Sequence, residues 1–182
     1  DMLHPTDLGH KMIADLICNL LDTEYSYYKK LGAEKKPSFP EPFTASRYED
    51  AQRFQNYSCS PVMEGFEPDT HAAEQWSDPF KGGWIAHKQG SCIKFNVSGS
   101  IIMLQYRKTI NKPAPVAYAV IDGDRQNKVL LDANFDEDWG DLCCLDEIYS
   151  GAKGEHTVEI VIDTEGKENS DFMLISVITA NK

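Results

Sequence analysis

An acidic and an imidazole side chain stand close together in the opening sequence DMLHPTDLGHKM, where Asp1 and His4 are three residues apart. A carboxylate that binds one imidazole nitrogen fixes the tautomer, so the other nitrogen can accept a proton from a serine nucleophile. An alternative is that the pair only marks the beginning of a helix, where the helix dipole favours an acidic side chain. The spacing therefore indicates either two members of a catalytic triad or an ordinary helix start.

The segment that follows this pair has helical periodicity. Apolar residues recur at steps of four, one and three, at Leu8, Met12, Ile13, Leu16, Ile17, Leu20 and Leu21, which is typical of one face of an amphipathic helix. Pro5 suits the entry to such a helix and Gly32 suits its end. Because an isolated amphipathic helix frays, we expect its apolar face either to dock on the rest of the chain or to pair with a second copy in a homodimer.

The opening block resembles the last conserved block of the SGNH (GDSL-type) hydrolases, in which an Asp-x-x-His-Pro run precedes a closing helix. The matching residues are Asp1, His4, Pro5 and Gly9, followed by the apolar helix. The resemblance implies that His4 is the general base of a Ser-His-Asp triad and that Asp1 is its orienting partner. It also implies that residues 1–32 form the end of a flavodoxin-like α/β domain, with that upstream catalytic domain as their partner.

The remaining machinery of such a hydrolase is not found in the sequence. No Gly-Asp-Ser-Leu-like block supplies a nucleophile, no Gly-x-Asn-Asp segment supplies an oxyanion donor, and Ser91, Ser98 and Ser100 lie in or beside strand-like runs. Since the nucleophile and the oxyanion hole account for most of the rate, we expect this chain alone to be inactive. The parent would be a serine esterase that removes acyl groups, most simply acetyl, from a carbohydrate or a similar small ester, without a cofactor.

A proline-rich stretch separates the first helix from the rest of the chain. Residues 33–50 contain three prolines and read as a linker. At its end, Ser46 and Glu49 match a capping box, which predicts a short helix over Arg47 to Phe54.

Residues 51–182 have the pattern of an all-β domain. Short β-branched or aromatic runs are bounded by Gly, Asp, Asn or Pro, in SCIKFNVSGS, IIMLQYRKT, VAYAVIDGD, NKVLLDA, HTVEIVID and DFMLISVIT. Gly99 is expected to break the first run from the second, and Asp122-Gly123-Asp124 to form a hairpin turn. The spacing predicts a mainly β fold, an antiparallel β-sandwich of jelly-roll type preceded by the helix. It resembles the sandwich modules that accompany carbohydrate-active SGNH esterases.

Two tryptophans are candidate ligand-binding residues of this sandwich. Trp84 follows two glycines and Trp139 lies in the loop NFDEDWGD, and either ring could stack on a sugar. The alternative, which we favour, is that they fill the core or plug an end of the sandwich. The acidic residues of the same loop, Asp132, Asp136, Glu137, Asp138 and Asp141, could bind calcium, but a solvated loop is the better interpretation and we assign no metal.

Composition limits the partners. Twenty-nine acidic against 18 basic residues give a net charge of −11, which repels nucleic acid, and no apolar run is long enough to span a membrane. The five cysteines, an odd number that includes the adjacent Cys143 and Cys144, favour reduced thiols and weakly favour a cytoplasmic location. We expect His156 to form a hydrogen bond within the fold, and the pattern assigns no role to His71 or His87. The alternative to the esterase is a non-catalytic carbohydrate-binding or structural module.

Overall fold

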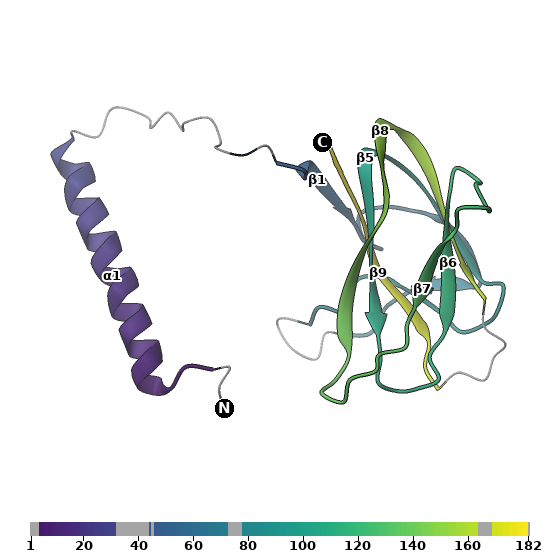
Figure 1. The fold of residues 1–182 in the computed structure, drawn as a ribbon, viewed down its shortest axis with the longest axis horizontal. Coiled ribbons are helices and arrows are strands. Elements are labelled where there is room, and N and C mark those ends of the chain that lie inside the picture. The colour runs from purple at the N-terminus through teal and green to yellow at the C-terminus, as the bar shows by residue number, and fades with distance from the viewer. Residues whose placement is uncertain (1–3, 32–43, 45, 73–77, 164–168, 182) are drawn as a thin grey trace. The chain divides into compact units, whose positions relative to one another are not determined.

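The computed structural model describes residues 4–31, 44, 46–72, 78–163 and 169–181. By its internal contacts the chain divides into two units, Asp1–Thr44 and Ala45–Lys182. The first contains the helix α1, Asp7–Lys30, and the second contains nine strands (Figure 1). Among the described residues, no helix combines the length and the apolar character needed to cross a membrane.

The strands of the second unit form one antiparallel network. They are β1 (Glu49–Phe54), β2 (Val62–Glu64), β3 (Phe66–Pro68), β4 (Trp84–Ala86), β5 (Cys92–Lys108), β6 (Val116–Ile121), β7 (Val129–Asp132), β8 (Leu142–Ile162) and β9 (Phe172–Asn181). The main order is β3-β4-β9-β5-β8-β6-β7, while β1 pairs with β9 and β2 with β5. The fold is therefore mainly β, an antiparallel sandwich preceded by a helix, as the sequence predicts.

Two long strands, β5 and β8, join the two layers of the sandwich. The first half of β5 pairs with β2 and the second half with β9, while β8 follows β5 along its whole length. The end of β8 also pairs with β6. Each long strand therefore belongs to one layer at one end and to the other layer at its opposite end (Figure 1).

Gly99 does not break this strand, so the expectation of a turn there is wrong. The register of β5 against β8 shifts between Gly99 and Ile101, and a Cβ on Gly99 would lie 3.1 Å from the carbonyl oxygen of Ala180. Hydrogen bonding to two neighbouring strands keeps the backbone extended where its sequence favours a turn. The glycine allows the close approach at the bend.

The predicted short helix over residues 47–54 is also wrong, because residues 49–54 form β1. Ser46 Oγ accepts a hydrogen bond from the backbone N–H of Tyr48 at 3.2 Å, which forms a local turn and not the predicted capping box. The chain then pairs with β9, with Phe54 opposite Val177, and the Phe54 side chain packs on the core. Strand pairing and apolar burial outweigh the local helix signal.

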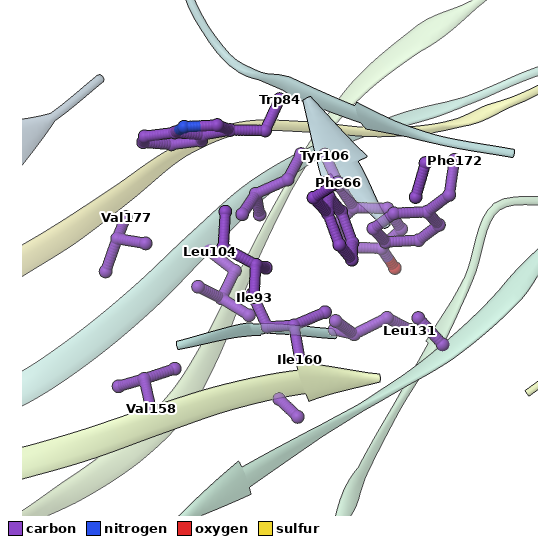
Figure 2. Packing of buried hydrophobic residues seen from close by; sticks show 14 of the residues in the cluster. Phe66, Trp84, Ile93, Leu104, Tyr106, Leu131, Val158, Ile160, Phe172 and Val177 are labelled. Carbon is purple, nitrogen blue, oxygen red and sulfur yellow. The ribbon is translucent and has the colours of Figure 1, made fainter. Parts of the chain in front are cut away.

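The core lies between the layers and comes from strands distant in sequence. In the first half of β5, Ile93, Phe95 and Val97 are buried while the residues between them are exposed. Figure 2 shows Ile93 in the same cluster as Val158 and Ile160 of β8 and the aromatic rings of other strands, and Phe95 and Val97 belong to that cluster as well. The period-two alternation that the sequence shows here is the pattern of a half-buried strand.

Candidate functional site

The beginning of α1 places His4 directly before a well-capped helix. Thr6 is the N-cap, and its Oγ1 accepts a hydrogen bond from the backbone N–H of Gly9 at 3.2 Å. A Cβ on Gly9 would lie only 3.0 Å from Cβ of Pro5, so glycine lets the chain turn tightly into the helix. His4 is exposed, and Asp1 lies outside the described residues. The geometry of the Asp1–His4 pair thus stays a prediction.

The helix carries an exposed apolar stripe. It ends at Lys30 with Leu31 as its C-cap, so the predicted stop at Gly32 lies just outside the described residues. No residue of α1 is buried, and the seven apolar residues of the predicted face, Leu8, Met12, Ile13, Leu16, Ile17, Leu20 and Leu21, are all exposed. Such a stripe normally faces a protein core.

Trp84 is part of the core rather than a sugar platform. Its side chain is 1% exposed, and its ring meets Phe95 edge-to-face with the centroids 5.0 Å apart. The preceding Gly83 packs so closely on β9 that a Cβ there would lie 2.0 Å from the carbonyl oxygen of Leu174. This close approach draws Trp84 inward, so the ring fills the core (Figure 2). The interpretation of Trp84 as a ligand-binding residue is therefore wrong.

Trp139 is placed where a ligand could reach it. The residue is 64% exposed, and its ring lies edge-to-face against Phe135 with the centroids 5.1 Å apart. Phe135 therefore supports the indole while most of its surface stays open to solvent. Sugar stacking by Trp139 remains a prediction.

The acidic residues near Trp139 face different partners. Asp136 lies 2.5 Å from Lys112 Nζ, Asp141 Oδ1 accepts the backbone N–H of Ile110, and Asp132 Oδ1 accepts the Asn134 side chain at 2.6 Å. The Lys112 ammonium lowers the pKa of Asp136, mainly through their hydrogen bond. Within the described ranges, no three His, Cys, Asp or Glu side chains come together as a metal site.

The adjacent cysteines point to opposite sides of β8. Cys144 packs on the main core, and Cys143 packs on a smaller cluster with Met173 and Ile175. Burial raises the pKa of both thiols, which keeps them protonated and unreactive. Cys18, in contrast, is exposed on α1.

Three histidines of the sandwich contact carboxylates, one of them close in sequence and two of them distant. His71 Nδ1 lies 2.8 Å from Oδ1 of Asp69, whose carboxylate is fully buried while the imidazole is 73% exposed. His156 Nδ1 lies 2.8 Å from Asp122 Oδ2, which confirms the expectation that His156 is hydrogen-bonded within the fold. Asp122 precedes His156 by 34 residues, so no local pattern could have indicated this pair.

The third histidine lies between two carboxylates. His87 Nδ1 is 2.6 Å from Asp171 Oδ1 and its Nε2 is 3.0 Å from Glu67 Oε1. An ionised carboxylate only accepts hydrogen bonds, so both contacts are satisfied together only when the imidazole carries two protons. The hydrogen bonds, that to Glu67 first, raise the pKa of His87 above its ordinary value.

No protein-family model and no curated protein matches the chain. Solved structures that resemble the chain include carbohydrate esterases. A distant neighbour is a family two carbohydrate esterase from Cellvibrio japonicus. It has 13% identity and a TM-score of 0.54, and the match covers 73% of this chain and 34% of that esterase. At that identity it shows the fold alone.

Two structures share both sequence and fold with the chain. Both are described as a two-domain esterase (CEX) active on acetylated mannans, one of them co-crystallised with mannopentaose. The first has 40% identity and a TM-score of 0.85, and covers 100% of this chain and 49% of its own. The co-crystal has 41% identity and a TM-score of 0.82, and covers 99% and 48%. The chain thus spans about half the length of the esterase that it matches.

Proposed function

We propose that the chain is the C-terminal portion of an SGNH-type serine esterase that removes acetyl groups from a carbohydrate, with acetylated mannan as the first candidate substrate. The observation that carries the proposal is the likeness at 40–41% identity, over nearly the whole chain, to an esterase active on acetylated mannans. In this proposal residues 1–32 complete the catalytic domain, residues 33–50 form the linker between the two domains, and residues 51–182 form the accessory sandwich.

The beginning of α1 supports a catalytic role for His4. The Thr6 cap and the side-chain-free Gly9 hold the turn that presents His4 at the helix N-terminus. The apolar stripe behind it needs a cover, which an upstream α/β domain would provide. The capped turn and the exposed stripe are what the closing helix of such a hydrolase requires.

The chemistry follows from the roles of the pair. His4 takes the proton of a serine hydroxyl as its oxygen attacks the acetyl carbonyl, and Asp1 holds the imidazole in the required tautomer. His4 then returns that proton to the sugar oxygen that leaves, so an acetyl-enzyme and a free hydroxyl are formed. In the second half, His4 takes a proton from water as the water oxygen attacks the acetyl carbonyl. The bond between the acetyl group and the serine oxygen then breaks, and His4 gives its proton to that oxygen, so acetate is released and the free serine hydroxyl is restored. The serine and the oxyanion donors come from the upstream domain.

The test compares acetate release by two proteins, the 182-residue chain and the same chain preceded by the sequence that lies upstream in its gene. Only the longer protein should release acetate from acetylated mannan and from p-nitrophenyl acetate. His4→Ala in the longer protein should lower kcat at least 1,000-fold, since loss of a triad member has effects of that order or larger. The matched control is His10→Ala, which removes an exposed imidazole from the same helix and should leave kcat unchanged. Rapid turnover by the 182-residue chain would refute the proposal.

A second candidate function is a non-catalytic carbohydrate-binding module, and the exposure of Trp139 favours it. Its test is calorimetry of the 182-residue chain with manno-oligosaccharides. Saturable binding that Trp139→Ala abolishes would support the module, and Phe135→Leu should weaken binding less because it leaves the indole in place. If the longer protein hydrolyses ester and the 182-residue chain shows no saturable binding of manno-oligosaccharides, the accessory sandwich is structural.

A further inference from the structure

A small cavity lies where the loop after β6 faces an irregular stretch of β8. Its volume is about 290 Å³, and it is lined by Ile121, Asp122, Asp124, Asn127, Ile148 and Tyr149. Ligand pockets span roughly 300–1,000 Å³, so this cavity is suited to a single ring rather than to a chain of rings. It belongs wholly to the sandwich and contains no residue discussed above as catalytic.

A bulge in β8 builds one wall of this cavity. Gly99 of β5 pairs with Gly154 and Ile101 pairs with Ser150, so residues 151–153 lie opposite the single residue Ser100. The bulge brings Tyr149 and His156 together, with ring centroids 4.3 Å apart. Bulges often redirect side chains at functional sites.

Two further contacts hold the Tyr149 ring in place. Its hydroxyl donates to the carbonyl oxygen of Ala152 at 3.1 Å. A Cβ on Gly151 would lie 2.5 Å from that hydroxyl, so only glycine leaves room for the ring. A rigid aromatic wall offers apolar contact at little entropic cost.

The lining also carries fixed hydrogen-bonding groups. Asp122 Oδ1 accepts the backbone N–H of Thr157 and Oδ2 accepts His156 Nδ1, each at 2.8 Å. Asp124 Oδ2 accepts the Asn127 side chain at 2.7 Å. These hydrogen bonds, led by that from His156, lower the pKa of Asp122, and those from Asn127 lower the pKa of Asp124. Both carboxylates are therefore ionised acceptors with fixed orientations.

The His156 imidazole, which binds Asp122, has one ring nitrogen without a hydrogen-bond partner among the described residues. The His156 side chain is only 9% exposed, and its Nε2 is buried without a hydrogen-bond partner among the described residues. Since Asp122 is ionised and only accepts, Nδ1 of His156 carries the proton of that bond. The imidazole is thus fixed by Asp122 through Nδ1 and packs against Tyr149, which lines the cavity, while its Nε2 lacks a hydrogen-bond partner among the described residues.

From this combination we infer that the cavity is a binding site for one neutral pyranose unit of a carbohydrate. Tyr149, Ile121 and Ile148 offer apolar contact to the C–H face of the ring, while Asp122, Asp124 and Asn127 can bind neighbouring hydroxyl groups. Two carboxylates with no Lys or Arg in the lining disfavour uronic acids and phosphates. Calcium fits poorly, because it takes six to eight oxygen ligands, whereas two carboxylates and one side-chain amide line the cavity.

All lining residues of the cavity belong to the sandwich, and sugar binding there is measured without any ester hydrolysis. A negative binding result would therefore leave the proposed esterase function untouched. The experiment is an amide NMR titration of the 182-residue chain with methyl mannoside, methyl glucoside, mannotriose, methyl glucuronide and calcium chloride in separate arms. The neutral sugars should produce saturable shifts at residues 121–127 and 148–156, and the glucuronide should not. No saturable shift with any neutral sugar, or shifts at these residues with calcium alone, would overturn the inference.

Variants of exposed loop residues test the contacts without disturbing the core. Asp124→Ala and Asn127→Ala should each raise the Kd at least tenfold, whereas Tyr149→Phe, which keeps the ring, should raise it less. The matched control is Asp136→Ala, an exposed carboxylate outside the cavity, and it should leave the Kd unchanged. Unchanged binding in both Asp124→Ala and Asn127→Ala, with thermal unfolding as in the unmodified chain, would place the sugar elsewhere.

Discussion

The helix α1 and the sandwich differ in whether their apolar side chains are covered within the same unit. Every residue of α1 is at least partly exposed, and its apolar stripe is formed by residues close in sequence. The sandwich buries its apolar residues by pairing strands that are distant in sequence, such as β5 with β9. The comparison teaches that a strong local pattern can specify a helix without providing its cover, whereas the sandwich carries its own core.

The largest expected effect separates a buried from an exposed tryptophan of the sandwich. Trp84→Ala should lower the free energy of unfolding by about 3–5 kcal/mol, because it opens a cavity in the core. Trp139→Ala should change it by less than about 0.5 kcal/mol, as is usual for exposed positions. Urea unfolding of the 182-residue chain measures both. A loss below 1 kcal/mol for Trp84→Ala would contradict a self-sufficient core.

The next effect concerns backbone packing at the edge of β4. Gly83→Ala should destabilise the sandwich by about 2–3 kcal/mol, because its Cβ would overlap the backbone of Leu174. Gly90→Ala is the control, since a Cβ there meets nothing within 4 Å. Its positive φ of 79° should still cost about 1 kcal/mol. Equal losses in the two variants, measured by thermal unfolding, would remove the argument for a close approach.

A smaller effect should appear as a pH dependence confined to the sandwich. The pKa of His87 is raised above 6.5 by Glu67 and Asp171, so its contribution is complete below pH 6.5 and is lost as the pH rises through the raised pKa. Arg107 also faces this group, because its Nη2 donates to the carbonyl oxygen of Asp171.

The measurement is the difference in Tm between the chain and its His87→Gln variant from pH 6.5 upward. We expect the difference to shrink towards zero on the alkaline side and to correspond to less than about 1 kcal/mol, because exposed ion pairs are screened. The control, His10→Gln, lies on α1 outside the sandwich and should leave the Tm of the sandwich unchanged. A stabilisation by His87 that grows with pH would have the wrong sign and would refute the protonated bridge.

The smallest effect on stability is expected for the helix. Replacing Leu16 and Leu20 with Ser should shift the urea midpoint of the sandwich by less than the equivalent of about 0.5 kcal/mol. We expect the amides of residues 8–21 to be protected from hydrogen exchange in the unmodified chain, because the stripe needs a cover, and the double variant should lose that protection. Rapid exchange throughout residues 8–21 of the unmodified chain would contradict docking or pairing.

Sequence patterns were informative wherever a structure depends on neighbouring residues. The alternation of Ile93, Phe95 and Val97 predicts the buried face of β5, and Asp122-Gly123 predicts the turn, where both residues have positive φ. The first two thirds of β8 were missed, because polar residues and glycines between residues 142 and 155 hide its strand character. Only its ladder with β5 makes this stretch extended.

The candidate sites show the same division. The Asp-x-x-His-Pro block is contiguous and visible in the sequence, whereas Trp84 and Trp139 could not be ranked from it. Both tryptophans stand near glycines, but the approach of Gly83 to β9 buries one and a loop exposes the other. Burial depends on which backbone lies opposite, and that information is not local.

Local sequence patterns were enough to predict the helix with its apolar stripe, the all-β character of the remainder, and the block that points to ester hydrolysis. These depend on backbone preferences and on periods of 3.6 and 2, which act over a few residues. Long-range contacts, in contrast, make residues 49–54 pair as a strand, bury Trp84 in the core and bring Asp122 to His156. Such contacts depend on strand register and on a bulge, and they are stabilised by burial and hydrogen bonds between segments that no local pattern connects.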